Sequence, residues 1–196
     1  LSDYILTDEE EKILIAEPEM AEFSIGDLFD VEKWTYGKNK NWISRYDEYQ
    51  EGRTPVISGI TKNNGVIYYT EDEYDDTEIQ QPGLTITTRG EHSGTVFYHD
   101  EPFLLLNNVL TLQISNVTKN QQLFLATLIM KLRYGGYNNY PKKETLAADY
   151  LQLPIQTDKD NNPILDPDKT YHPNGYIPDW DFMEKYIRAI EKVVIA

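Results

Sequence analysis

The run GLTITTRGEHSGTVFYHDEPFLLLNNVLTL, residues 83–112, decides the fold. Its first two segments, 83–90 and 94–100, are rich in β-branched and aromatic residues and flank a short turn of glutamate, histidine and serine. The third segment, 103–115, supplies one or two more strands, with an Asn-Asn pair as a turn or bulge. Short β-rich runs separated by turn residues predict strands that pair with their neighbours in the chain.

The segment before this run repeats the same pattern. Residues 54–70, TPVISGITKNNGVIYYT, hold two β-rich stretches on either side of the turn sequence KNNG. An Asn-Gly pair is a strong hairpin signal because both residues tolerate the left-handed backbone of a type I′ turn. Residues 54–115 are therefore predicted to be mostly antiparallel β structure.

Helical patterns follow the β-rich part. Residues 120–133, NQQLFLATLIMKLR, carry leucine and isoleucine at helical spacing, with two glycines just beyond the last turn. From Pro178 the chain has an apolar stripe at the same spacing and an aspartate suited to cap a helix. The expected fold class is α+β, a β-rich mixed globular body followed by the start of a long helix.

Three parts are expected along the chain. Residues 1–22 form an acidic leader or linker with a Thr-x-x-Glu capping signature, residues 23–177 form one globular domain, and residues 178–196 begin the helix. The first residue is Leu1 rather than methionine, and the terminal helix lacks a capping residue at its end. We therefore expect the chain to be a piece of a longer protein.

The charge of the chain is strongly negative but unevenly distributed. With 33 acidic against 18 basic residues the formal net charge is −15, which opposes binding to a polyanion. The acids cluster in residues 8–22, 71–78 and 158–168, whereas residues 119–143 contain five basic residues and no acid. Such a distribution is compatible with one basic face on an otherwise acidic protein.

Sequence motifs of catalysis are absent. There is no glycine-rich cofactor loop, no Gly-x-Ser-x-Gly, no Walker loop, no His-Glu-x-x-His and no Asn/Asp-Pro-Pro-aromatic motif for a flipped base. We therefore expect no catalytic residue and no cofactor, and the chain is not expected to be an enzyme by itself.

Signals for metals and membranes are equally weak. The chain has no cysteine, and its three histidines are scattered. The loop 158–162 begins like a calcium loop, but Pro163 stands at the place of the sharp-turn glycine and Lys169 at that of the bidentate glutamate, so no metal site is expected. The N-terminus is acidic and no apolar run reaches about 18 residues, which favours a cytoplasmic location.

Several segments in their order resemble a known family. They are FSIGDLFDV, TPVISGITKNNGVIYY, GLTITTRGEHSGTVFYHDEPFLLLNNVLTL, LFLATLIMKLRYGGYNNYPKKETLAADYLQLPI and IPDWDFMEKYIRAIEK. Together, from about Phe23 to the end, they are similar to one target recognition domain of the specificity subunit of type I restriction-modification systems. The equivalent domains of type IIG and type IIB enzymes share this resemblance. Because only one body and one helix occur, the resemblance indicates a half-subunit or a fragment.

The resemblance implies a function and partners. The body would read a half-site of double-stranded DNA and so direct the methyltransferase and restriction activities of a complex. The helix would pair with a second recognition domain and dock the methyltransferase subunit or fused domain. The alternative is an acidic protein-protein interaction module or DNA mimic, against which the acid-free stretch 119–143 argues.

Candidate DNA contacts lie in four polar stretches. Arginine and lysine read guanine in the major groove, whereas asparagine and glutamine read adenine. Loops at one end of the sheet are expected to carry these side chains. The candidates are Lys38, Lys40, Trp42, Arg45, Lys62, Asn63, Asn64, Arg89, His92, Tyr137, Asn138, Asn139, Lys142 and Lys143.

Each stretch also has a purely structural explanation. Residues 38–45 could be a solvated loop, the Asn-Gly pair could serve its turn alone, and the glycines flanking residues 91–93 could do the same. The loop 134–143 is the favoured surface because tyrosine, asparagine and lysine alternate there without an acid; its alternative is a tyrosine-rich structural loop. Within it, Lys142 and Lys143 suit phosphates, and the tyrosine and asparagines suit bases or sugars.

The terminal helix carries candidates for a protein interface. They are Phe182, Tyr186, Ile190, Val193 and Val194. Packing back on the body is the alternative explanation, and for the nearby Trp180 it is the preferred one. The distal three residues would otherwise leave an exposed apolar stripe, which favours contact with a partner.

Overall fold

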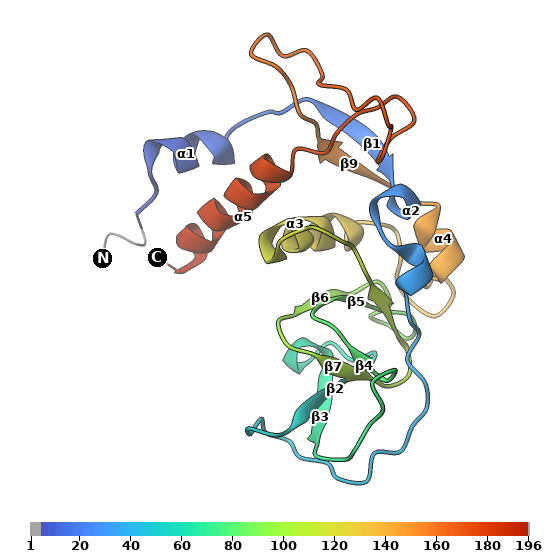
Figure 1. Cartoon of the computed structure of the whole chain (residues 1–196). Helices are drawn as coiled ribbons and strands as arrows, with labels where there is room; N and C mark the ends of the chain where they lie inside the picture. Colours follow the sequence, from blue (N-terminus) through green and yellow to red (C-terminus); the bar gives the residue numbers. More distant parts are fainter. Residues whose placement is uncertain (1–4, 196) are drawn as a thin grey trace.

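The computed structural model describes residues 5–195 of the chain (Figure 1). Residues 54–112 build two small sheets at one end of the molecule, and helices with a third, two-stranded sheet occupy the other end. The segments near the two termini lie side by side on one flank. These separate sheets and helices confirm the predicted α+β fold class.

The central sheet comes from the run 83–112. Its strands are β5 (Gly83–Thr87), β6 (Val96–His99) and β8 (Val109–Leu112), in the order β6-β5-β8. Both pairings are antiparallel, as predicted, and Thr87 of β5 stands opposite Val109 of β8. Every residue of the middle strand β5 is buried, which makes this sheet a rigid base for the loops at its ends.

The second sheet combines neighbouring and distant strands. Its strands are β2 (Thr54–Ile57), β3 (Val66–Thr70), β4 (Ile79–Gln80) and β7 (Phe103–Leu105), in the order β3-β2-β7-β4. The predicted hairpin of β2 and β3 is confirmed. However, β2 and β7 pair in parallel, an exception to the antiparallel pattern that the sequence predicted.

The turn between β2 and β3 is longer than a two-residue hairpin turn. It contains the single-turn 3-10 helix η3 (Asn63–Gly65), and all three residues have positive φ angles. The Asn64 side chain donates a 2.8 Å hydrogen bond to the Tyr98 carbonyl on β6. Asn64 therefore attaches the turn to the central sheet. The sequence analysis proposed Asn64 as a DNA contact and did not predict this structural role.

The third sheet joins the start of the body to its end. Strand β1 (Met20–Ser24) pairs antiparallel with β9 (Tyr150–Pro154), and Phe23 stands opposite Leu151. Two short helices follow β1: α2 (Ile25–Leu28) and the 3-10 helix η2 (Val31–Lys33). Strand β1 begins at Met20, three residues before residue 23, where the sequence analysis expects the globular domain to begin.

Helix α3 (Lys119–Ile129) lies between the central sheet and the C-terminal helix α5 (Trp180–Ile195) (Figure 1). Thr118 caps α3 in a reciprocal capping box with Gln121. The helix ends at Ile129, four residues before the predicted end, and the chain continues through turns into the short helix α4 (Lys143–Ala147).

The acidic leader is docked on the body. It forms helix α1 (Asp8–Leu14), whose predicted capping box between Thr7 and Glu10 is present. Lys192 of α5 lies 2.6 Å from the Glu10 carboxylate, and Lys185 lies 3.3 Å from that of Glu9. A leader packed along α5 in this way is part of the fold rather than a free linker.

Two aromatic residues of α5, Trp180 and Tyr186, contact the body. Tyr186 packs edge-on against Phe124 of α3 with ring centroids 5.8 Å apart, and Phe182 stacks on Tyr186. Tyr186 is half-buried, and its ring attaches α5 to α3, as in the alternative explanation of packing on the body. Trp180 packs on the body, as preferred. Only the distal Val193 and Val194, 53% and 78% exposed, remain open among these apolar positions, with Ile190 half-buried.

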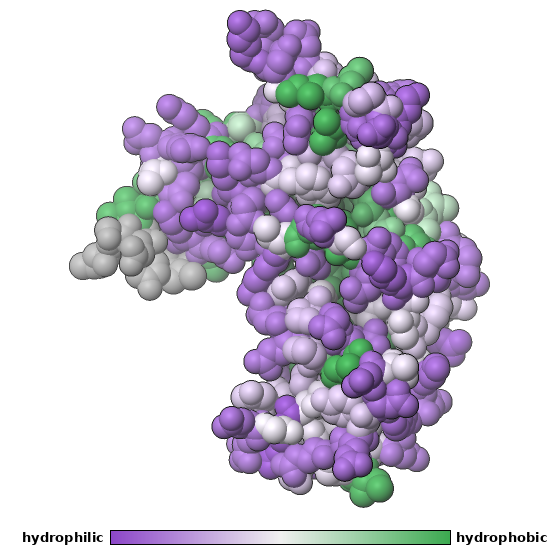
Figure 2. Space-filling model, in the orientation of Figure 1, coloured by the Kyte–Doolittle hydropathy of each residue, from purple (hydrophilic) through white to green (hydrophobic). Residues whose placement is uncertain are grey.

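One large core holds the helices, the central sheet and the β1–β9 pair together. Two smaller clusters lie around the second sheet, one with Trp42 and one with Val109 of the central sheet. Phe23, Leu84, Leu110 and Leu125 are completely buried in the large core. Hydrophilic side chains cover most of the face in Figure 2, with small separate apolar areas. No helix in residues 5–195 combines the length and hydropathy of a membrane span.

His99 is buried at the end of β6, where its Nε2 atom shares a 2.9 Å hydrogen bond with the Thr85 hydroxyl. Burial lowers the pKa of His99 from 6.5 to about 4, so the folded protein holds a neutral imidazole at pH 7. As the pH falls below 6.5, His99 becomes protonated in the unfolded chain but stays neutral in the folded protein. Stability is therefore full above pH 6.5 and is lost progressively toward pH 4.

We predict that His99 destabilises the folded state by about 2 kcal/mol between pH 6.5 and pH 5. His99→Gln keeps a side chain able to bond Thr85 but cannot titrate. The difference in unfolding free energy between wild type and variant, measured by chemical denaturation at several pH values, should therefore shrink as the pH falls. A difference that stays constant from pH 7 to pH 5 would show that the buried imidazole titrates normally.

Candidate nucleic-acid interface

The turn between β7 and β8 is the floor of the candidate site, and three separate loops are bonded to it. The amide of Gly37 donates to the Val109 carbonyl at 2.9 Å, and the amide of Gly59 to the Asn107 carbonyl at 3.2 Å. The amide of Thr88 donates to the Asn108 carbonyl at 2.9 Å. Loops that are far apart in sequence thus meet at one end of the central sheet.

Two of these loops approach the floor too closely for a side chain. A Cβ atom built on Gly37 would lie 1.5 Å from the Leu106 carbonyl oxygen, and one on Gly59 would lie 2.5 Å from that of Asn108. Glycine is therefore required at both positions for steric reasons. The sequence contained both glycines, but no local pattern indicated what they approach.

Two adjoining cavities of about 630 and 640 Å3 open above this floor. They share Arg89, Asn108 and Tyr140, and we call them together the loop hollow. Its lining is polar or aromatic for the most part, and no acidic residue lies among its lining residues in the described chain. The lining residues are Tyr36, Gly37, Asn39, Gly59, Thr88, Arg89, Gly90, Asn107, Asn108, Val109, Tyr137, Tyr140, Pro141 and Lys142.

The loop hollow brings together three predicted residues from two stretches, Arg89, Tyr137 and Lys142. Tyr137 is 79% exposed, and the Lys142 ammonium lies 5.4 Å from the ring centre of Tyr140. Lys143 is adjacent, and its amide donates a 2.7 Å hydrogen bond to the Tyr36 hydroxyl. A basic and aromatic rim of this kind is suited to phosphates and bases.

The tyrosine-rich loop is held in place by the glycine-flanked turn beside it. The Ser93 hydroxyl donates to the Gly136 carbonyl at 3.0 Å. A Cβ atom on Gly94 would lie 2.8 Å from that of Tyr134, so the two loops are in close contact. Tyr134 in turn donates to Asp149 through its hydroxyl, and burial together with this bond raises its pKa to about 12. His92 is exposed on the turn and does not line the loop hollow.

The stretch 38–45 is bound mainly to its own chain. Trp42 is only 3% exposed and packs against Val56, Tyr68 and Leu104, so the expectation that its ring contacts DNA is wrong. The burial of an aromatic ring in an apolar cluster explains this difference. Lys38 is exposed and stays available.

Lys40 and Arg45 also have internal partners. Lys40 bonds to Glu78 and lies 4.0 Å from the ring centre of Trp42. The Lys40 ammonium holds the pKa of Glu78 below its ordinary value, aided by the amide of Asp75. Arg45 lies over the Tyr68 ring and donates to the Trp42 carbonyl at 3.1 Å. The structure therefore directs both cations toward their own chain rather than toward the loop hollow.

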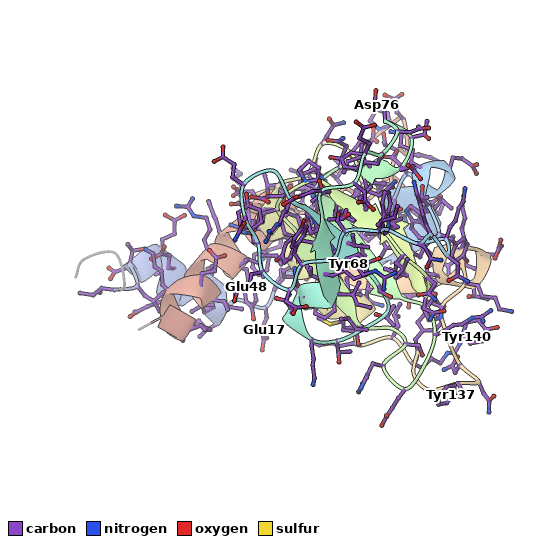
Figure 3. The ribbon with its side chains drawn as sticks, turned by 90° about the horizontal axis from the view of Figure 1, so that it is seen from below. Glu17, Glu48, Tyr68, Asp76, Tyr137 and Tyr140 are labelled. Carbon is purple, nitrogen blue, oxygen red and sulfur yellow. The ribbon has the colours of Figure 1, made fainter. Side chains whose placement is uncertain are left out.

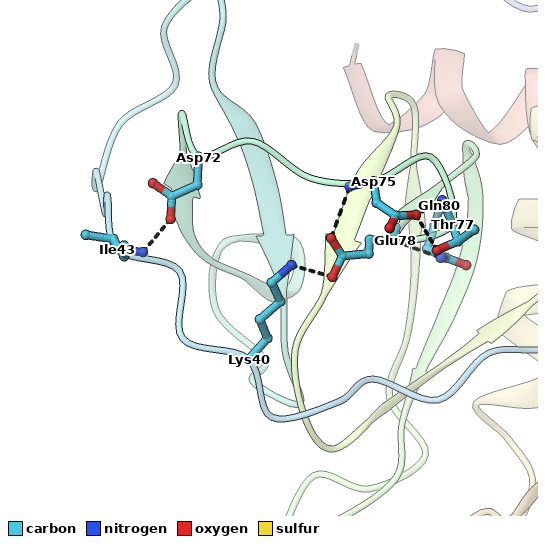
Figure 4. Close-up of polar contacts among 7 residues, drawn as sticks. All are labelled: Lys40, Ile43, Asp72, Asp75, Thr77, Glu78 and Gln80. Atoms are coloured by element: carbon cyan, nitrogen blue, oxygen red, sulfur yellow. Dashed lines mark hydrogen bonds and ion pairs between the residues drawn. The ribbon is translucent and has the colours of Figure 1, made fainter.

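The acidic segment 71–78 holds that stretch, and its Glu78 lines a neighbouring cavity that shares Tyr36 and Asn39 with the loop hollow. The Asp72 carboxylate accepts a hydrogen bond from the amide of Ile43, and Glu78 bonds to Lys40 (Figure 4). The amide of Ser44 also donates to Asp72. In Figure 3, Tyr137 and Tyr140 lie together at one edge of the molecule and Asp76 lies at the opposite edge. Asp76 is thus separated from the two tyrosines of the loop hollow, and the charge of Glu78, which lies nearer, is paired with Lys40.

The sequence analysis missed several lining residues. Asn107 and Asn108 were interpreted as a turn or bulge only, although the positive φ of 62° at Asn108 does mark a tight turn. Asn39 and Tyr140 lay inside proposed stretches but were not selected, and Tyr36 carried no local signal. Conversely, Lys62, Asn63 and Asn64 do not line the loop hollow.

The loop that resembles a calcium site is satisfied by its own atoms. The Asp158 carboxylate accepts hydrogen bonds from the amides of Asp160 and Asn162 at 2.8 and 2.9 Å, as in an aspartate-initiated turn. In residues 5–195 no three histidine, cysteine or acidic side chains gather as metal ligands would. The geometry is that of a solvated turn.

A polar hollow built by loops on a rigid sheet defines a binding domain. Residues 17–167, more than half of the chain, match the family described as the type I restriction modification DNA specificity domain. The chain therefore belongs to this family, and the resemblance seen in the sequence is confirmed.

Individual relatives agree with this assignment. A curated Mycoplasma pneumoniae protein named as a type I specificity subunit is 31% identical over 139 residues, which are 70% of this chain and 42% of that protein. The S subunit of a Mycoplasma genitalium type I system matches all of this chain with a TM-score of 0.54 at 12% identity. The HsdS subunit of Thermoanaerobacter tengcongensis matches 95% of it with a TM-score of 0.50 at 12% identity. The chain spans 42% of each of these two solved chains.

Proposed function

We propose that this chain recognises one half-site of double-stranded DNA within a restriction-modification complex, and that the loop hollow is its reading surface. Membership of a family described by DNA specificity supports the choice of ligand. The observation that carries the proposal is the meeting of Arg89 with Tyr137 and Lys142 of a second loop in one hollow without an acidic lining residue among those described. Base-reading side chains need such a rigid polar surface.

The proposal assigns different kinds of DNA contact to the remaining predicted residues. Lys38, Lys142 and Lys143 would contact phosphates, whereas Tyr137, Asn138 and Asn139 would approach bases or sugars. Lys62, Asn63 and His92 are exposed outside the loop hollow and would contact flanking phosphates at most.

The assembly around the chain follows from the same proposal. The chain would direct methylation and restriction that other subunits perform, contributing no catalytic group itself, in the cytoplasm where the DNA lies. A methyltransferase subunit or a second recognition domain would contact α5 near Val193 and Val194, which are the exposed apolar residues at its distal end.

The alternative function is an acidic interaction module or DNA mimic. A mimic needs acids spread openly over one face. Glu71, Asp72 and Glu78 instead bond to their own chain, through Arg53, the amide of Ser44 and Lys40 respectively. This internal use of the acidic segment favours DNA recognition.

We predict that the double substitution Lys142→Gln and Lys143→Gln weakens DNA binding almost equally for all sequences. Loss of two phosphate contacts should lower the slope of log affinity against log salt by about 2. Binding is measured by selection from a randomised duplex pool and by titration at several salt concentrations, with and without the methyltransferase subunit.

A matched control is the double substitution Lys12→Gln and Lys159→Gln, which removes the same charge from exposed positions outside the loop hollow. It should leave the salt slope unchanged. Absence of any enriched motif for the wild type, with the methyltransferase subunit present, would reject DNA reading and favour the acidic module.

A further inference from the structure

We infer that Arg89 and Asn108 are the base-reading pair of the loop hollow, Arg89 for a guanine and Asn108 for an adenine in the same half-site. This inference rests on the proposed function and assigns the sequence specificity of that surface to two named side chains. Asn108 was not among the residues that the sequence indicated.

The two residues extend from the same end of adjacent strands. Thr87 at the end of β5 pairs with Val109 at the start of β8. Arg89 follows Thr87 by two residues, and Asn108 directly precedes Val109. The 2.9 Å hydrogen bond from the Thr88 amide to the Asn108 carbonyl links the two loops between these side chains. The backbone therefore fixes the position of one residue relative to the other, as paired readout requires.

Both side chains lie where a ligand can reach them. Arg89 and Asn108 line both cavities of the loop hollow, and both residues are exposed. Within the described chain, neither the Arg89 guanidinium nor the Asn108 amide group forms a hydrogen bond, and the guanidinium forms no ion pair. In an acidic protein with 33 carboxylates, an arginine without a carboxylate partner keeps its full hydrogen-bonding capacity for a ligand.

Several neighbouring polar side chains are already engaged, although Asn39, which also lines the hollow, forms no side-chain hydrogen bond among the described residues. The Asn107 side-chain oxygen accepts a 3.3 Å hydrogen bond from Ser58, and the Asn139 amide donates to the Arg133 carbonyl. Lys142 lies over the ring of Tyr140. Arg89 and Asn108 are thus distinguished from these engaged neighbours by the absence of an internal partner among the described residues.

The chemistry of the two groups assigns their bases. A guanidinium presents two parallel donors that match the O6 and N7 acceptors of guanine. A carboxamide presents one acceptor and one donor, which match the N6 amino group and N7 of adenine. Each bidentate pair discriminates against other bases by about tenfold in affinity.

The test is selection from a randomised duplex pool with the full chain, alone and with the methyltransferase subunit, for wild type and four variants. Arg89→Ala should remove the preference for guanine at one position, about tenfold in enrichment, and leave the other positions of the motif intact. Arg89→Lys keeps the charge but loses the bidentate geometry and should weaken the same preference.

Asn108→Gly should likewise remove the preference for adenine at a different position. Glycine is chosen because the φ of Asn108 is 62°, which alanine tolerates poorly. The matched control is Asn161→Gly, because Asn161 has the same φ of 62° in the exposed loop after β9. It should leave the motif unchanged.

The outcomes separate this inference from the proposed function. A wild-type motif that Arg89→Ala and Asn108→Gly leave intact overturns the inference while DNA reading stands. Uniform weakening on all sequences also overturns it, because it identifies phosphate contacts. No motif for the wild type, even with the methyltransferase subunit, overturns both.

Discussion

Replacing Gly37 with alanine is expected to lower the free energy of unfolding by about 3 kcal/mol, an overpacking effect. The added Cβ would lie 1.5 Å from the Leu106 carbonyl oxygen and 3.0 Å from a Val109 methyl group, so the backbone must move. Gly37 does not have a positive φ, and the effect therefore arises from close approach alone. Urea denaturation, monitored by tyrosine and tryptophan fluorescence, measures the change in the free energy of unfolding.

The same substitution should also damage DNA recognition. Moving the loop at Gly37 away from the β7–β8 turn breaks the hydrogen bond to Val109 and displaces Asn39 and Tyr36 from the loop hollow. The control for the loss of stability is Gly135→Ala, because no atom lies within 4 Å of a Cβ built on Gly135 and its φ is not positive. Equal stability of the two variants would contradict the close approach.

Phe23→Ala is expected to cost about 4 kcal/mol of stability, because it removes a large ring from a filled core. Phe23 is completely buried on β1, opposite Leu151, and its ring meets that of His172 edge-on at 5.3 Å. The cavity would weaken the sheet that joins the beginning of the body to its end. Thermal and chemical denaturation measure the loss.

Met20→Ala on the same strand is the control for Phe23. Met20 is 47% exposed, so its truncation should change stability by about 0.5 kcal/mol or less. Phe23→Leu leaves a smaller cavity than Phe23→Ala, so its loss of stability should lie between those of Phe23→Ala and Met20→Ala. A loss below about 1 kcal/mol for Phe23→Ala would show that the β1–β9 sheet contributes little to the core.

Local patterns predicted the elements whose partners are near in sequence. The central sheet follows from alternating β-rich runs and turns in residues 83–112, and α3 follows from helical spacing with Thr118 as its cap. Both depend on contacts within a few tens of residues, which composition and periodicity encode. No local pattern marked the start of β1 at Met20, because this strand depends on a partner strand far along the chain.

Pairings between distant segments had no local signal. The parallel pairing of β2 with β7, the pairing of β1 with β9 and the docking of α1 on α5 all join segments that the sequence treats as independent. The free energy of such contacts comes from burial after the chain has folded, so it leaves no periodicity in either segment. The contact of Tyr186 with Phe124 of α3 is of the same kind.

The sequence by itself determined that this chain is an α+β DNA specificity domain with an acid-free, tyrosine-rich loop beside its central helix. Only the tertiary structure decided which polar residues line one surface. It buried Trp42, used Lys40 and Arg45 internally, and placed Asn108 beside Arg89. The physical reason is that composition reports the hydrogen-bonding capacity of a side chain, whereas burial and internal partners determine whether that capacity remains available to a ligand.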